Sequence, residues 1–152
     1  MSERRMSSDK KSKAVVAPLL IALSKSAFAG TLITEINGIE EAGVMHLAIY
    51  DAASAFENDG GDNGGPSEDI IDGIIEWVDT ESVTYRFEIP AGNYAIGIFI
   101  DTNANEALDR NFLQIPTEQY GFSNNAKGRF GPPSFADAAF NLESQLEIEI
   151  NL

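Results

Sequence analysis

The 152-residue sequence contains no cysteine and only one histidine, His46. Without cysteine the chain can form no disulfide bond, and a single histidine makes a zinc or copper site a poor fit. Nucleophilic catalysis needs a Ser or Cys beside a base, and after residue 29 the sequence offers only His46 and Lys127 as nitrogen bases. We therefore expect a protein without enzymatic activity. A weak carboxylate-based hydrolase is the catalytic alternative.

Basic residues are also scarce, and most of them precede residue 30. The chain has 10 Lys and Arg against 24 Asp and Glu, a net charge of −14. Six of the basic and two of the acidic residues precede residue 30, so the remainder has 4 basic and 22 acidic side chains, a net of −18. This charge repels nucleic acid and anionic membranes, and it favours cations and basic partners.

A long apolar run is missing as well. The run from Ala14 to Leu23 has ten residues, whereas a spanning helix needs about 20. Basic residues precede the run, and Ala27-Phe28-Ala29 follows it as a small-x-small cleavage pattern. The sequence predicts a signal peptide at 1–29, a single domain at 30–152 with no membrane span, and export to the periplasm or beyond.

From Thr31 onward apolar residues recur at every second position, with no convincing amphipathic helix. This alternation predicts seven strands, the first five at 31–37, 44–50, 70–78, 82–89 and 94–100, and the last two carrying Ala138, Phe140 and Leu142, and Leu146, Ile148, Ile150 and Leu152. We expect an all-β, seven-stranded antiparallel sandwich of the immunoglobulin-like kind. A long ordered loop follows the fifth strand.

The same alternation gives expectations for individual side chains outside that loop. It puts His46 on the solvent side of its strand and makes Trp77 the large apolar anchor of the third. The segment 51–69 is rich in glycine and acids, so we expect a mobile surface loop. The loop after the fifth strand carries many apolar residues and is expected to pack on the sandwich.

Oxygen-bearing side chains recur at every second position directly after the fifth strand. A hard cation such as calcium takes oxygen ligands at this spacing, and the candidates are Asp101, Asn103, Asn105 and Asp109, with the backbone oxygen of Ala107. Glu106 stands where an EF-hand has glycine, and Phe112 where it has its closing glutamate, so the loop is not an EF-hand. The alternative is a turn in which these side chains bond their own backbone.

Further along, aromatic rings alternate with amide and basic side chains. Rings for stacking and amides for hydrogen bonding suit a small glycan or a peptide, and the candidate binding residues are Tyr120, Phe122, Asn124, Asn125 and Arg129. The alternative is structural: the rings plug the open end of the sandwich, and the two asparagines cap loop backbone.

Four runs carry a resemblance to a known family: Asp101-x-Asn103-x-Asn105-x-x-x-Asp109, Asn111-Phe112-Leu113-x-Ile115-Pro116, Tyr120-Gly121-Phe122-Ser123-Asn124-Asn125 and Gly131-Pro132-Pro133-Ser134-Phe135. Together they resemble the exported bacterial family called domain of unknown function 2141. Pro90-Ala91-Gly92-x-Tyr94 is also similar to transthyretin-like and carboxypeptidase-regulatory-like sandwiches. The resemblance implies an exported β-sandwich without an established activity. We therefore expect a non-enzymatic protein that binds an ion or ligand through residues 101–135, with a carbohydrate- or peptide-binding envelope module as the alternative.

Overall fold

The computed structural model describes residues 29–60 and 70–152, and these residues form two β-sheets. The predicted signal peptide lies outside the described residues except for Ala29, where the first strand begins. No helix in the described part of the chain is long and apolar enough to cross a membrane.

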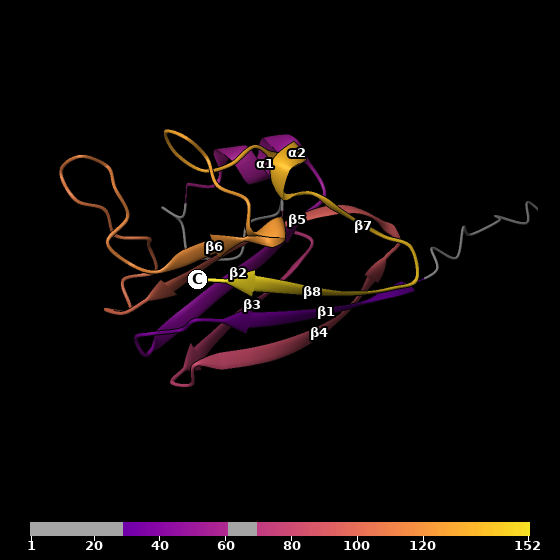
Figure 1. Cartoon of the computed structure of the whole chain (residues 1–152), viewed down its shortest axis with the longest axis horizontal. Helices are drawn as coiled ribbons and strands as arrows, with labels where there is room; N and C mark the ends of the chain where they lie inside the picture. Colours follow the sequence, from indigo (N-terminus) through magenta and orange to yellow (C-terminus); the bar gives the residue numbers. More distant parts are fainter. Residues whose placement is uncertain (1–28, 61–69) are drawn as a thin grey trace, which may run out of the picture.

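The smaller sheet has three strands in the order β4-β1-β8: β4 is Ser82–Pro90, β1 is Ala29–Asn37 and β8 is Gln145–Asn151. The larger sheet follows the order β3-β2-β5-β6: β3 is Asp72–Val78, β2 is Gly43–Tyr50, β5 is Gly92–Asp101 and β6 is Tyr120–Phe122. A short strand, β7 (Phe140–Leu142), pairs with the start of β5. Figure 1 shows β1, β4 and β8 side by side, with the C-terminus at the end of β8.

One hydrophobic core lies between the two sheets. Alternate residues of each strand point into it, which is the burial that a period of two specifies. The smaller sheet contributes Leu32, Ile36, Phe87, Ile89 and Ile150, and the larger sheet contributes Met45, Leu47, Ile49, Ile96, Ile98 and Ile100. The all-β prediction is therefore confirmed.

A second, smaller cluster covers part of the outer face of the larger sheet. Two short helices, α1 (Ala53–Asn58) and α2 (Phe135–Ala138), pack there against Tyr50 and Ala95, and Figure 1 shows them side by side. The buried ring of Phe56 makes edge contacts with Tyr50, Phe122 and Phe135. The expectation of a mobile surface loop at 51–69 is thus wrong for 53–58, which form a helix anchored by the buried ring of Phe56. Positions 61–69 lie outside the described residues.

Two details of the predicted topology are wrong. The described residues form eight strands rather than seven, because β6 is a three-residue strand inside the expected loop. The sheets are not wholly antiparallel, since β8 runs parallel to β1. Alternation reports which face of the sheet a residue occupies. It does not report which strands are neighbours, or whether two neighbouring strands run parallel or antiparallel.

Two expected side-chain positions in this part of the fold are also wrong. Trp77 is 59% exposed, because β3 turns it to the outer face of the larger sheet rather than to the core. Ala138 belongs to α2 and not to the strand that contains Phe140 and Leu142. A short apolar pattern does not decide which face of β3 carries Trp77, nor whether Ala138 belongs to a helix or to a strand.

Candidate ligand-binding cleft

Four residues from four strands form a row across the outer face of the larger sheet. Strand register puts Ile75 opposite His46, His46 opposite Phe99, and Phe99 opposite Tyr120. Directly paired residues point to the same face of a sheet, so all four side chains lie on the face opposite the core. Three of the four are hydrophobic, and His46 is the exception. The row forms one side of a hollow in the surface.

Small residues line the floor of that hollow. Gly73, Ala48 and Gly97 pair directly across β3, β2 and β5, and Phe122 follows on β6. Without larger side chains here, the outer face leaves a cleft of about 960 Å³. This volume falls within the usual range for small-molecule sites.

The segment after β5 supplies much of the cleft wall. Its contributions come from 108–116 and 128–132, and the apolar side chains among them are Leu108, Leu113, Ile115, Pro116, Phe130 and Pro132. The expectation that this segment packs tightly on the sandwich is wrong for several of its apolar residues: Phe112 is 90% exposed, and Leu113, Ile115 and Phe130 are also exposed. Most of these side chains border the cleft without being covered.

The lining also contains polar side chains, among them those of Tyr50, Asp59, Arg110 and Arg129. Tyr50 donates a hydrogen bond to Asp59, and Arg110 donates to the backbone oxygen of Gly60. Burial raises the pKa of the Tyr50 hydroxyl, and the hydrogen bond to Asp59 adds to the effect. Tyr50 therefore stays protonated and acts as a donor. Arg129 is exposed on the wall formed by 128–132.

His46 is buried at the cleft, contrary to the expectation of a solvent-facing position. Its ring is stacked on Phe99, with centroids 4.6 Å apart, and Nε2 lies 3.6 Å from a carboxylate oxygen of Asp101. Within the described part of the chain, neither ring nitrogen makes a hydrogen bond. The expectation failed because it assumed that only one face of the larger sheet is covered, whereas loops also cover part of the outer face.

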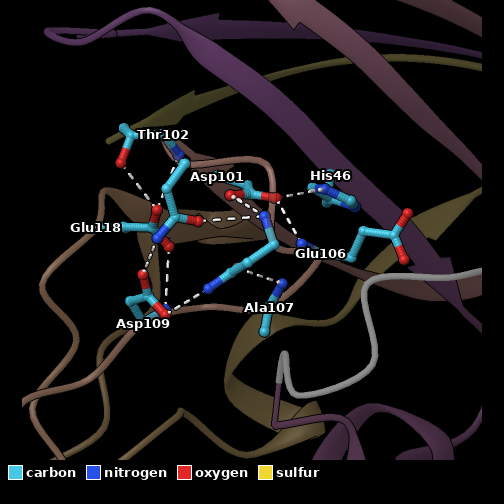
Figure 2. Close-up of polar contacts among 9 residues, drawn as sticks. His46, Asp101, Thr102, Glu106, Ala107, Asp109 and Glu118 are labelled. Carbon is cyan, nitrogen blue, oxygen red and sulfur yellow. Dashed lines mark hydrogen bonds and ion pairs between the residues drawn. The ribbon is translucent and has the colours of Figure 1, made fainter.

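Asp101 is 1% exposed and organises the loop that follows β5. One of its carboxylate oxygens accepts from the backbone N–H of Asn105 at 3.2 Å, and the other accepts from that of Glu106 at 2.8 Å. Figure 2 shows these bonds together with the contact to His46, which is made by the oxygen that also accepts from Glu106. The carboxylate thus links the loop to β2.

The loop curls at two residues in the left-handed region of backbone space. Ala104 has φ 56° and Glu106 has φ 63°. A side chain is strained there by about 1–2 kcal/mol relative to glycine. Glu106 thus adopts a turn for which an EF-hand uses glycine, and the Asp101 carboxylate accepts the N–H that this turn presents.

The remaining candidate ligands bond to one another. The side-chain amides of Asn103 and Asn105 donate to the two carboxylate oxygens of Asp109, at 2.5 and 2.8 Å. Glu118, which the sequence analysis did not single out, accepts from the backbone of Thr102 and of Asp109, as Figure 2 shows. In the described residues, no three side chains of His, Cys, Asp or Glu converge as a metal site. The side-chain oxygens of Asn103 and Asn105 accept from the backbone N–H groups of residues 105 and 107, which agrees with the alternative of a turn whose side chains bond their own backbone.

The structure divides the candidate binding residues into two groups. Tyr120, Phe122 and Arg129 line the cleft. Asn124 donates to the backbone oxygens of residues 137 and 139, and the Asn125 side chain accepts from the backbone N–H of residue 151. These asparagines therefore hold loop backbone in place, as the structural alternative for them proposed.

Together, the fold and the cleft define an all-β protein of two sheets with a ligand-sized hollow on one outer face. The chain belongs to the family described as "uncharacterized protein conserved in bacteria (DUF2141)", whose profile matches residues 34–149. No curated protein and no solved structure gives a significant match.

Proposed function

We propose that this protein is an exported, non-enzymatic binding protein whose cleft takes an apolar stretch of a peptide. The observation that carries the proposal is the cleft of about 960 Å³ over the small residues Ala48, Gly73 and Gly97. A backbone or a ring can approach such a floor closely, because no long side chain stands between it and the sheet.

The chemistry of the lining favours a peptide over a glycan. Glycan sites combine aromatic faces with many hydrogen-bonding side chains, whereas the side chains that face this cleft include aliphatic groups such as Ile75, Leu108, Leu113 and Ile115. Rings of Phe99, Tyr120 and Phe122 would still stack on a sugar, so a small glycan is the alternative ligand.

Parallel arrays of peptides and of glycans, including peptidoglycan fragments, test this proposal on the folded protein. We expect binding to peptides with several apolar residues and little binding to glycans. Trp77, the only tryptophan, borders the cleft row on β3, so its fluorescence reports binding in solution. Binding to glycans alone, or to neither array, would contradict the proposal.

The hydrolase alternative finds little support in the lining. The pair of His46 and Asp101 has the composition of a base and its orienting carboxylate. Among the described residues that line the cleft, however, there is no serine, threonine, cysteine or lysine to act with His46 as a nucleophile. A screen of ester, amide and glycoside substrates at neutral pH tests this, and turnover that is lost on His46→Ala would favour the enzyme.

Calcium bound by the loop after β5 is the second candidate function. The curl at Ala104 and Glu106 supports it, because this curl brings Asn103 and Asn105 around Asp109. Carboxylate and amide oxygens suit calcium, and the ion would take the amide oxygens of Asn103 and Asn105 in place of the backbone N–H groups that they accept from here.

Thermal unfolding with millimolar calcium tests this site. We expect the wild-type melting temperature to rise, because an ion that binds only the folded state stabilises it, and we expect no rise for Asp109→Ala. Equal melting temperatures for the wild-type protein with and without calcium would contradict the site and leave the cleft proposal unaffected.

Export and the finer fold class belong to the same proposal. The signal at 1–29 predicts a mature chain that starts at Gly30, and mass spectrometry of the exported protein tests that end. An intact N-terminus on protein recovered outside the cytoplasm would argue against cleavage. For the fold, two sheets around one core support an immunoglobulin-like or transthyretin-like sandwich, which an experimental structure would test by its strand connections.

A further inference from the structure

The strand β3 lies at the edge of the larger sheet and borders the cleft. In the sheet order it has β2 on one side and no strand of the described residues on the other. An edge strand presents unpaired backbone N–H and C=O groups, and natural proteins usually blunt such edges with lysine, proline or a covering segment. Asp72–Val78 contains no lysine or proline, and Ile75 and Trp77 on it are 57% and 59% exposed.

The two faces of this edge differ in chemistry. On the outer face, Ile75 and Trp77 point the same way as the cleft row. On the inner side, Asp72 and Glu76 are exposed, and Glu76 accepts a hydrogen bond from the Tyr85 hydroxyl at 3.0 Å. A strand alongside β3 would therefore meet apolar side chains on one face and carboxylates on the other.

We propose that β3 is a docking edge for an extended peptide that adds a strand to the larger sheet, with apolar side chains toward Trp77 and the cleft and basic side chains toward Asp72 and Glu76. This inference deepens the cleft proposal and rests on it for the apolar side. The docking edge adds to the cleft proposal that the ligand is an extended strand, that its apolar and basic side chains alternate, and that it is positively charged. Backbone hydrogen bonds supply affinity in such strand addition, and the alternate side chains supply specificity.

Charge decides between a peptide partner and a second copy of this chain. Two copies joined at β3 would bring Asp72 and Glu76 of each chain together, and the net charge of −18 after residue 29 would add to that repulsion. Acidic side chains at an edge thus oppose self-association while they attract a basic strand. The edge fits a partner that is opposite in charge and apolar on one face.

The test uses a synthetic peptide of alternating valine and lysine, acetylated and amidated, with the seven-residue length of β3. We expect it to bind the folded protein, and we expect the valine–glutamate counterpart to bind at least about tenfold more weakly. Methylation of the peptide's backbone nitrogens at one set of alternate positions should weaken binding about tenfold or more, because those N–H groups pair with β3. Methylation of the other set should have little effect.

A protein variant and its control complete the experiment. Trp77→Lys places a positive charge beside the docked strand and should weaken binding about tenfold. Gln145→Lys makes the same charge change at an exposed site on β8, at the opposite edge of the smaller sheet from β4, and should leave binding unchanged. Trp77 does not line the cleft, so its substitution leaves the cleft intact.

Each result has a distinct meaning. No binding of the valine–lysine peptide, or equal losses from both sets of N-methylation, would overturn the strand-addition proposal. If other apolar peptides still bind and compete with one another for the cleft, the cleft proposal stands without the strand-addition proposal. Sedimentation that shows a dimer of the wild-type protein but a monomer of Trp77→Lys would assign the edge to a second copy and overturn the peptide partner.

Discussion

Replacing Asp101 by alanine is expected to lower the free energy of unfolding by about 3 kcal/mol. The carboxylate is buried, and it accepts backbone N–H groups of residues 105 and 106 on the loop side. The oxygen that accepts from residue 106 also faces the ring of His46. Its removal leaves these donors without their acceptor in a space that little water reaches, and buried donors without partners are destabilising. Urea unfolding, followed by circular dichroism, measures the loss.

Two further substitutions separate the burial of Asp101 from its charge. Asp101→Asn retains one oxygen acceptor and should lose less stability than the alanine variant. Asp109→Ala removes a carboxylate that is only half-buried and that accepts side-chain amides from within the loop, so we expect a loss of about 1 kcal/mol. If Asp101→Ala and Asp109→Ala lose equal stability, the loop is not organised around Asp101.

Filling the floor of the cleft should have the largest effect on binding. Gly97→Val is expected to weaken binding of apolar peptides by about tenfold or more, because its methyl groups would occupy the space over β5. The fold has room for a Cβ at Gly97, which would lie 3.7 Å from the ring of Phe122, an ordinary contact, and the melting temperature of the variant checks that the two γ methyl groups are accepted as well. Valine also suits a strand better than glycine does, so stability should be unchanged or slightly higher.

The matched control for this variant is Thr84→Val at an exposed position of β4, a strand of the smaller sheet that does not line the cleft. Gly97→Ala should give an intermediate loss of affinity, since it adds one methyl group. Titration of each variant with the same peptide, together with its melting temperature, separates binding from folding. Unchanged affinity for Gly97→Val with an intact fold would move the ligand away from the cleft.

Much of the fold could be predicted because alternation reports burial directly. The strands β4, β5 and β8 lie within one or two residues of their predicted limits, and Ile150 and Phe87 point into the core as their patterns indicate. Strand pairing could not be predicted in the same way. The parallel contact of β8 with β1 joins segments more than 100 positions apart, and a period of two does not specify it.

The candidate site was predicted in part, for physical reasons that differ between residues. Tyr120 and Phe122 line the cleft as ring-bearing residues of the segment after β5. The floor residues Ala48 and Gly97 were not predicted, because a small residue in a strand has no functional group that indicates a binding site. His46 was missed because alternation puts it on the face opposite the core but does not show that the ring of Phe99 and the carboxylate of Asp101 lie against it there.

The most direct test of the cleft is amide chemical-shift mapping of the isotope-labelled protein as an apolar peptide is added. The account predicts that the largest shifts cluster on the outer face of the larger sheet, at His46, Ala48, Gly97 and Phe99, and on the wall at 113–116. Residues of β1 and β4 should remain unshifted. Shifts spread over the smaller sheet, or confined to the loop at 102–109, would contradict the claim that this hollow is where the protein binds its ligand.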